Sequence, residues 1–473
     1  VFTRYLIYHT HYWKQATQAG KTTGLRRFQV FYDAPERDLK GKNSGEVAGL
    51  TLDRLSKATS LRQLEGRLTP PSNGHSKYIP WLLAFAQQVK KRSLDKFGIV
   101  VHFKKASHGS STREAGENLR KKYGLRDREK KQAPIRQYFL RYGDIRRETR
   151  SDAFKLFRLL SSPDPVVPFI VGIDAASLEL TTPPEVFAPA FRFLKEYPID
   201  IRKCGTSRAY SERHDYVARL VNNRLLGMTY HVGEDFRHLL SGLRAIHEVV
   251  EYFEPQPGDR LGHAIALGLD PEVWSKQMGY HAVVPKQEWL DTLVWIHSFL
   301  GAGNDLVGEL SIEERIQYFS KTIYAKTKLV PERYIDLYCI PITLYDSWRL
   351  RQLDPYSIGN SNPLGVTPGD GNLEHTQDNV PPDDIKPGKQ LFSIPYRGDS
   401  PWQRRWLDVQ KKILKKLKKK VGSDGAYLLT NLYWFCPRVA EEGRKPVTID
   451  MIGKKKLWLQ LCRQVQEKLK KIV

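Results

Sequence analysis

Short apolar runs alternate with longer amphipathic stretches from the N-terminus to about residue 284. Each run has the length of a β-strand, and the stretch after it repeats apolar residues at helical spacing. The expected strands are Arg62 to Leu68, Phe97 to Phe103, Pro168 to Asp174, Met228 to His231 and Arg260 to His263. Strands that alternate with helices in this way predict an α/β fold with a parallel sheet.

The clearest expected helix follows Glu234. Its apolar residues recur at spacings of three and four: Phe236, Leu239, Leu240, Leu243, Ile246, Val249, Val250 and Phe253. Several expected strands also end in a polar or ionisable residue. Because the strands of a (β/α)8 barrel carry the active site at their C-terminal ends, the pattern favours a TIM-type (β/α)8 barrel. The motifs given below imply, by resemblance, the metal-dependent hydrolase kind of this barrel.

The alternation ends near Pro285, which divides the chain into three expected parts. Residues 1–284 would form most of the barrel, without all of its strands. Residues 285–453 would form a large, mainly helical insertion containing a Pro/Gly-rich loop at 354–400, and 454–473 a helix leading back to the barrel. We expect the insertion to pack outside the barrel and to contribute to self-association into a large homo-oligomer.

Composition indicates a folded protein, with 40% hydrophobic and 11% aromatic residues in 473. We find neither an apolar run of membrane-spanning length nor the zones of a signal peptide, and the four cysteines form no CxxC pair. These features predict a cytoplasmic protein with no membrane partner. They also argue against the cytidine-deaminase type of zinc site, which needs PCxxC.

The formal net charge is +24, which favours a nucleotide, a nucleic acid or another polyanion as partner. Much of the excess lies in lysine runs, such as that between Lys411 and Lys420. A solvated helix face explains such runs equally simply.

The strongest local motif is His-Val-Gly-Glu at 231–234, where a strand-end imidazole precedes a carboxylate by three residues. A neutral imidazole is a good zinc ligand, and a nearby carboxylate can move a proton. Gly233 permits the close turn that brings both side chains to one pocket. The alternative is a structural His231 bonded to a carbonyl, with Glu234 at a helix start.

A second strand-end histidine, His263, ends Arg-Leu-Gly-His at 260–263, one strand-helix unit further on. Two such histidines on neighbouring parallel strands would share one edge of the sheet. A third run, Gly-Ile-Asp-Ala-Ala at 172–176, ends the preceding strand and contains Asp174. The three motifs together predict a site made by His231, Glu234 and His263.

The ordered motifs GIDxA, HxGE and R[IL]GH resemble those of the adenosine deaminase family in the amidohydrolase superfamily. The resemblance covers residues 60 to 270 and implies a zinc-dependent deaminase that converts an adenine-containing substrate to its inosine form. It implies that His231 binds Zn²⁺, Glu234 protonates the purine ring, and His263 orients the attacking hydroxide. It also places Asp174 and Ser177 in the substrate-binding part. Ser177 replaces a family glycine, so substrate preference is open.

The family also has an HxH on strand one and an aspartate on strand eight. His9 and His11 form an HxH, but the aromatic residues around them favour a helix, on which these two side chains could not share a metal. They are therefore weak candidate ligands. We expect strands one, seven and eight to lie before Val1 and after Val473.

The insertion is similar in its placement to that of the adenosine deaminase component of the bacterial anti-phage system RADAR, whose partner is an AAA+ ATPase. This resemblance implies an adenosine nucleotide such as ATP or dATP, or adenosine in RNA, as substrate. Two alternatives stay open: another metal hydrolase on the same barrel, and a non-catalytic oligomeric scaffold or nucleic-acid-binding barrel.

Overall fold

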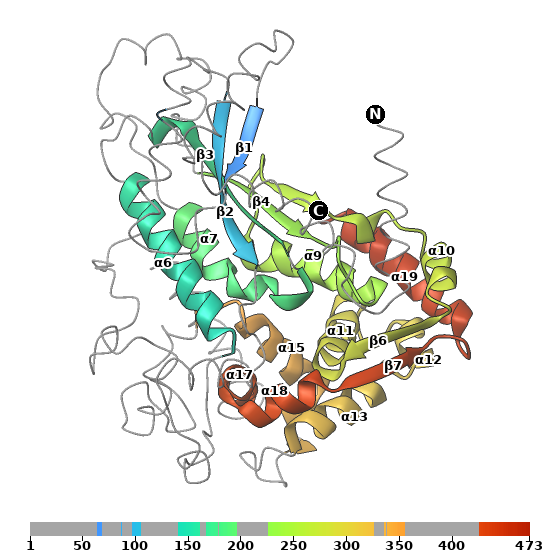
Figure 1. Ribbon diagram of the computed structural model, residues 1–473. Coiled ribbons are helices and arrows are strands. Elements are labelled where there is room, and N and C mark those ends of the chain that lie inside the picture. The colour runs from blue at the N-terminus through green and yellow to red at the C-terminus, as the bar shows by residue number, and fades with distance from the viewer. Residues whose placement is uncertain are drawn as a thin grey trace, which may run out of the picture.

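The computed structural model contains a five-stranded parallel sheet in the order β1-β2-β3-β4-β5 (Figure 1). It describes residues 64–68, 87, 97–105, 141–160, 167–177, 179–195, 226–325, 335, 336, 338–354 and 425–473. The strands are β1 (Leu64–Leu68), β2 (Phe97–Lys105), β3 (Ile170–Ser177), β4 (Gly227–Val232) and β5 (Arg260–His263). All five expected strands are thus confirmed, as is the α/β fold with a parallel sheet.

Helices α6 (Gly143–Leu160), α7 (Ala188–Lys195) and α9 (Leu239–Phe253) pack along one face of the sheet. Met228, Tyr230 and Val232 of β4 belong to the buried core that these helices cover. Successive side chains of a strand point to opposite faces, so Thr229 and His231 face the other side. The alternation therefore places the apolar side chains of β4 on the helix-covered face and its polar side chains on the opposite face.

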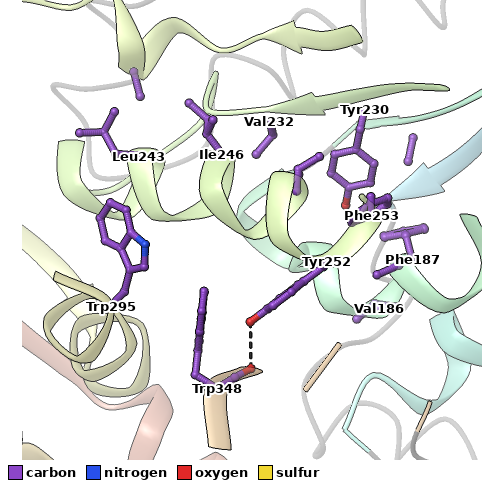
Figure 2. Close-up of a cluster of buried hydrophobic side chains, with 14 of the residues drawn as sticks. Val186, Phe187, Tyr230, Val232, Leu243, Ile246, Tyr252, Phe253, Trp295 and Trp348 are labelled. Carbon is purple, nitrogen blue, oxygen red and sulfur yellow. Dashed lines mark hydrogen bonds between the residues drawn. The ribbon is translucent and has the colours of Figure 1, made fainter. Parts of the chain in front are cut away.

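The expected helix after Glu234 is confirmed as α9. His238 caps its first turn by accepting a hydrogen bond from the Leu240 amide at 3.1 Å. Its apolar side packs against Tyr230 and Val232 of β4, and Tyr252 donates a hydrogen bond to the Trp348 carbonyl at 2.9 Å (Figure 2). The same core therefore joins the sheet to the helices that follow it in sequence.

Those later helices are α10 (Pro271–Gln277), α11 (Lys286–Leu300), α12 (Asp305–Glu309), α13 (Ile312–Tyr324), α15 (Pro341–Leu350), α17 (Gly425–Phe435), α18 (Pro437–Arg444) and α19 (Lys455–Lys470). Of these helices α11 and α19 pack against α9, and the others pack against these two or against one another. Four short 3-10 turns also occur: η3 (Val167–Phe169), η4 (Glu179–Thr181), η5 (Pro184–Val186) and η8 (Ile265–Leu267). Most of the described residues after 285 are helical, with the strand β7 (Pro446–Asp450) as an exception.

An antiparallel ribbon of β6 (His281–Pro285) and β7 (Pro446–Asp450) pairs the two ends of this helical region. Neither strand was expected from the pattern. The ribbon returns the chain to α19, which packs on α9 and α10. None of the helices in the described ranges combines the length and apolarity needed to cross a bilayer.

The core beneath β4 should dominate stability. Leu243 on α9 is fully buried, so Leu243→Ala should lower the free energy of unfolding by about 2–5 kcal/mol in urea denaturation. Val283 on β6 is 60% exposed, so Val283→Ala should change it by less than about 0.5 kcal/mol. Equal effects of the two substitutions would contradict this location of the core.

Candidate functional site

Three strands place polar side chains at one edge of the sheet, where their C-terminal ends meet. Asp174 and His231 lie on β3 and β4, and His263 ends β5. The strands are parallel and in register, with His231 paired to Gly262 and Val232 to His263. The sheet thus brings together residues far apart in sequence.

Asp174 fixes the ring of His231. Its carboxylate is fully buried and lies 3.0 Å from His231 Nδ1, while its other oxygen lies 3.2 Å from Nε of Arg67 on β1. Arg67 Nη1 in turn lies 2.9 Å from His231 Nε2. A guanidinium only donates, so Nε2 accepts and Nδ1 carries the proton given to Asp174. The Nε2 lone pair of His231 therefore accepts a hydrogen bond from the Arg67 guanidinium.

Gly262 leaves room for that ring. A Cβ at this position would lie 2.9 Å from His231 Cγ, closer than side chains ordinarily approach. Gly233 has a positive φ of 73° and lies against Ile246 of α9, so the chain turns sharply after β4. Gly262 thus provides the space for the His231 ring, and Gly233 provides the close turn that the HxGE motif predicted.

Glu234 and His263 meet in front of His231. Glu234 Oε2 lies 3.2 Å from His263 Nε2, and the ring centroids of His231 and His263 are 5.0 Å apart. The Glu234 carboxylate is 16% exposed and the His263 ring 35% exposed. His263 itself has a positive φ of 65°, which ends β5 and turns the chain into η8. A half-open cluster of two imidazoles and a carboxylate results.

The electrostatics of the cluster favour a protonated carboxyl. Burial, with the nearby charges of Asp235 and Glu179, raises the pKa of Glu234 to about 8, while Lys105 opposes the rise. Burial and Glu179 likewise raise the pKa of Asp235 to about 6. Glu234 can therefore donate a proton near neutral pH.

The structure brings together His231, Glu234, His263 and Asp174, but leaves the other candidates less defined. Asp174 holds His231 from behind, so its expected contact with substrate stays a prediction. Ser177 is the last residue of β3, and its side chain lies outside the described parts. His9 and His11 also lie outside the described residues.

Sequence reasoning did not assign roles to Arg67, Lys105 or Glu179. Lys105 ends β2, and Glu179 lies in η4 just after β3. The available signal for Lys105 was a charged side chain that continues the alternate apolar series Ile99, Val101 and Phe103 of β2. Arg67 lies two residues after Glu65 on β1, so the two side chains share one face of the strand. Two charged residues on one face were the signal that Arg67 faces the polar side of the sheet.

A metal can be tested against these residues. His231 fits one ligand once Arg67 Nη1 leaves its Nε2, because Asp174 fixes the ring as a hydrogen-bonded carboxylate commonly does at metal sites. A catalytic zinc needs three protein ligands, and within the described residues no group of three His, Cys, Asp or Glu side chains could hold an ion. The described residues thus supply one ligand and no complete metal site.

Comparison with known proteins adds no family. No family model matches the chain, and no curated protein matches it as a relative. The chemistry of the site must therefore be argued from its geometry.

The raised pKa of Glu234 predicts a pH-dependent stability. The folded protein retains a proton that the unfolded chain loses above its ordinary pKa of 4.5, so stability attributable to Glu234 falls as pH rises from 4.5 to about 8. Glu234→Gln removes this dependence. Urea unfolding should show the variant gaining at least about 1 kcal/mol on the parent between pH 5 and pH 8. A constant difference across that range would contradict the assignment.

Proposed function

We propose that the chain is a metal-dependent deaminase that removes the amino group of an adenine-containing substrate by hydrolysis of its C–N bond. The substrate would be a nucleotide such as ATP or dATP, or adenosine in RNA. The observation that carries the proposal is the contact between Glu234 and His263, 3.2 Å apart beside His231 at adjoining strand ends. The five parallel strands would be strands two to six of a (β/α)8 barrel.

Glu234 has the properties that the acid in this reaction needs. A protonated carboxyl donates its proton to a ring nitrogen of the purine, which makes the carbon that bears the amino group more electrophilic. Water adds at that carbon, and Glu234 regains a proton from it. Proton transfer to the amine lets ammonia leave as the C–N bond breaks. One water is consumed and one ammonia released.

In this proposal His263 would orient the attacking water. Its Nε2 lies against Glu234 Oε2, so an oxygen bound between the two side chains would contact both. His231 would bind Zn²⁺ through Nε2 in place of its present hydrogen bond from Arg67 Nη1, and His9 and His11 are the candidate ligands elsewhere in the chain. Zinc lowers the pKa of water and so supplies a nucleophile at neutral pH.

The wider setting belongs to the same proposal. A net charge of +24 suits a substrate that carries phosphate. Self-association would use residues 285–453, because of their composition and their position between barrel elements. A cytoplasmic location rests on the cysteine pattern and on the sequence having no apolar run of membrane-spanning length. An AAA+ ATPase partner and a role in bacterial anti-phage defence rest on the resemblance to RADAR.

Glu234→Gln keeps the shape of the side chain and removes the proton transfer. We expect it to lower turnover by at least about 10²- to 10⁴-fold while the protein stays folded. The assay follows conversion of adenosine, ATP and an adenosine-containing RNA to inosine forms by the change in purine absorbance. Near-normal turnover in the variant on the parent's substrate would rule out Glu234 as the proton carrier.

His231→Ala should lose zinc as well as activity, because the imidazole Nε2 would be a ligand. Metal content is measured by plasma mass spectrometry after zinc loading and gel filtration. The matched control is His281→Ala, since His281 lies on β6, pairs with the exposed Asp450, and should leave metal content unchanged. Full zinc content in His231→Ala would remove His231 from the metal site.

A further inference from the structure

Two charged side chains from other elements hold the turn that carries Glu234. At its start, the Lys105 ammonium donates to the His231 carbonyl oxygen. At its end, Glu179 Oε2 accepts from the backbone amides of Glu234 at 3.2 Å and Asp235 at 3.3 Å. The turn is thus anchored on both sides, from the end of β2 and from η4.

Lys105 occupies a place where an apolar residue would be the simpler choice. The preceding alternate residues of β2, Ile99, Val101 and Phe103, belong to the core under the helices. Lys105 continues that series, is 2% exposed, and its Nζ lies 3.9 Å from the centre of the Tyr230 ring. Burying an ammonium is costly unless nearby groups compensate it.

The compensation comes from carboxylates around the turn. Burial lowers the pKa of Lys105 to about 8, and among the carboxylates that oppose this effect Glu179 acts most strongly and Asp174 next. Glu179 in turn receives two amide hydrogen bonds, and a charged acceptor makes such bonds stronger than a neutral one. The buried lysine and this glutamate therefore stabilise each other's charge across the turn.

We propose that Lys105 and Glu179 are positioning residues, which fix the Glu234 carboxyl relative to the His231 ring. Lys105 holds the backbone at His231 and Glu179 holds it at Glu234 and Asp235. The His231 ring and the Glu234 carboxyl are thus set from the two ends of residues 231–235, which comprise the end of β4 and the turn after it. The hydrogen bonds of both side chains to this segment go to its backbone. The catalytic part of this inference rests on the proposed deamination, whereas the anchoring of the turn does not.

The first experiment measures the anchor directly, by hydrogen exchange of the Glu234 and Asp235 amides in the full chain. Glu179→Ala removes the acceptor, so both amides should exchange about tenfold faster. Glu179→Gln keeps a neutral acceptor oxygen and should retain most of the protection. The control is Glu251→Ala, which removes a half-buried carboxylate that pairs with Arg349 on α15. Unchanged exchange in Glu179→Ala would overturn the proposal.

The second experiment separates positioning from general stability. Lys105→Met should lower kcat by about 10- to 100-fold with KM within about twofold, because the reacting groups lose alignment. Its control is Lys195→Met, which removes a buried lysine paired with Asp259 at the opposite end of the sheet and should keep the parent's kcat. Equal losses of kcat in both variants would show that Lys105 acts through stability alone.

The two experiments also separate failure of this inference from failure of the proposed function. If no adenine-containing substrate is deaminated by the parent, the proposed function fails, and amide exchange in Glu179→Ala alone decides whether the turn is anchored as described. If the parent is active and Glu179→Ala and Lys105→Met both match it in kcat, the positioning role is wrong while the deaminase stands.

Discussion

The fully buried carboxylate of Asp174 is the constraint on which the polar edge of this sheet depends. A buried anion must have partners, and the parallel register of three strands provides them in His231 and Arg67. These contacts fix the tautomer and the direction of the His231 ring. Gly262 then has to be small, and the turn after β4 has to bring Glu234 back toward that ring. The geometry of the site follows from one buried charge.

Rigid packing on the opposite face holds this edge in place. Tyr230, next to His231, is fully buried against aromatic side chains of α7 and α9. Further along α9, Glu248 accepts a hydrogen bond from the Trp348 indole at 2.8 Å and pairs with Arg244, which ties α15 to the same core. Helices that lie far along the chain thus brace the strand that carries the site, as precise placement of reacting groups requires.

The strands, α9 and the pairing of His231 with Glu234 and His263 could be predicted from sequence, because strand periodicity and strand-end position are local signals. The β6–β7 ribbon could not, since its two short strands are separated by some 160 residues and pair only through the folded helices between them. The roles of Lys105 and Glu179 could not be predicted from the sequence for a related reason. The partners of these side chains are backbone atoms at the end of β4 and in the turn after it, and no side-chain motif records such contacts.

The proposed reaction adds water to an adenine ring at this strand-end cluster. The most direct measurement is mass spectrometry of purines after the zinc-loaded parent protein is incubated with adenosine, ATP and an adenosine-containing RNA in ¹⁸O-labelled water. Because the oxygen added to the purine comes from water, we expect an inosine-form product that carries one ¹⁸O atom, with release of ammonia. Recovery of all three substrates unchanged, or an inosine-form product without the label, would contradict it.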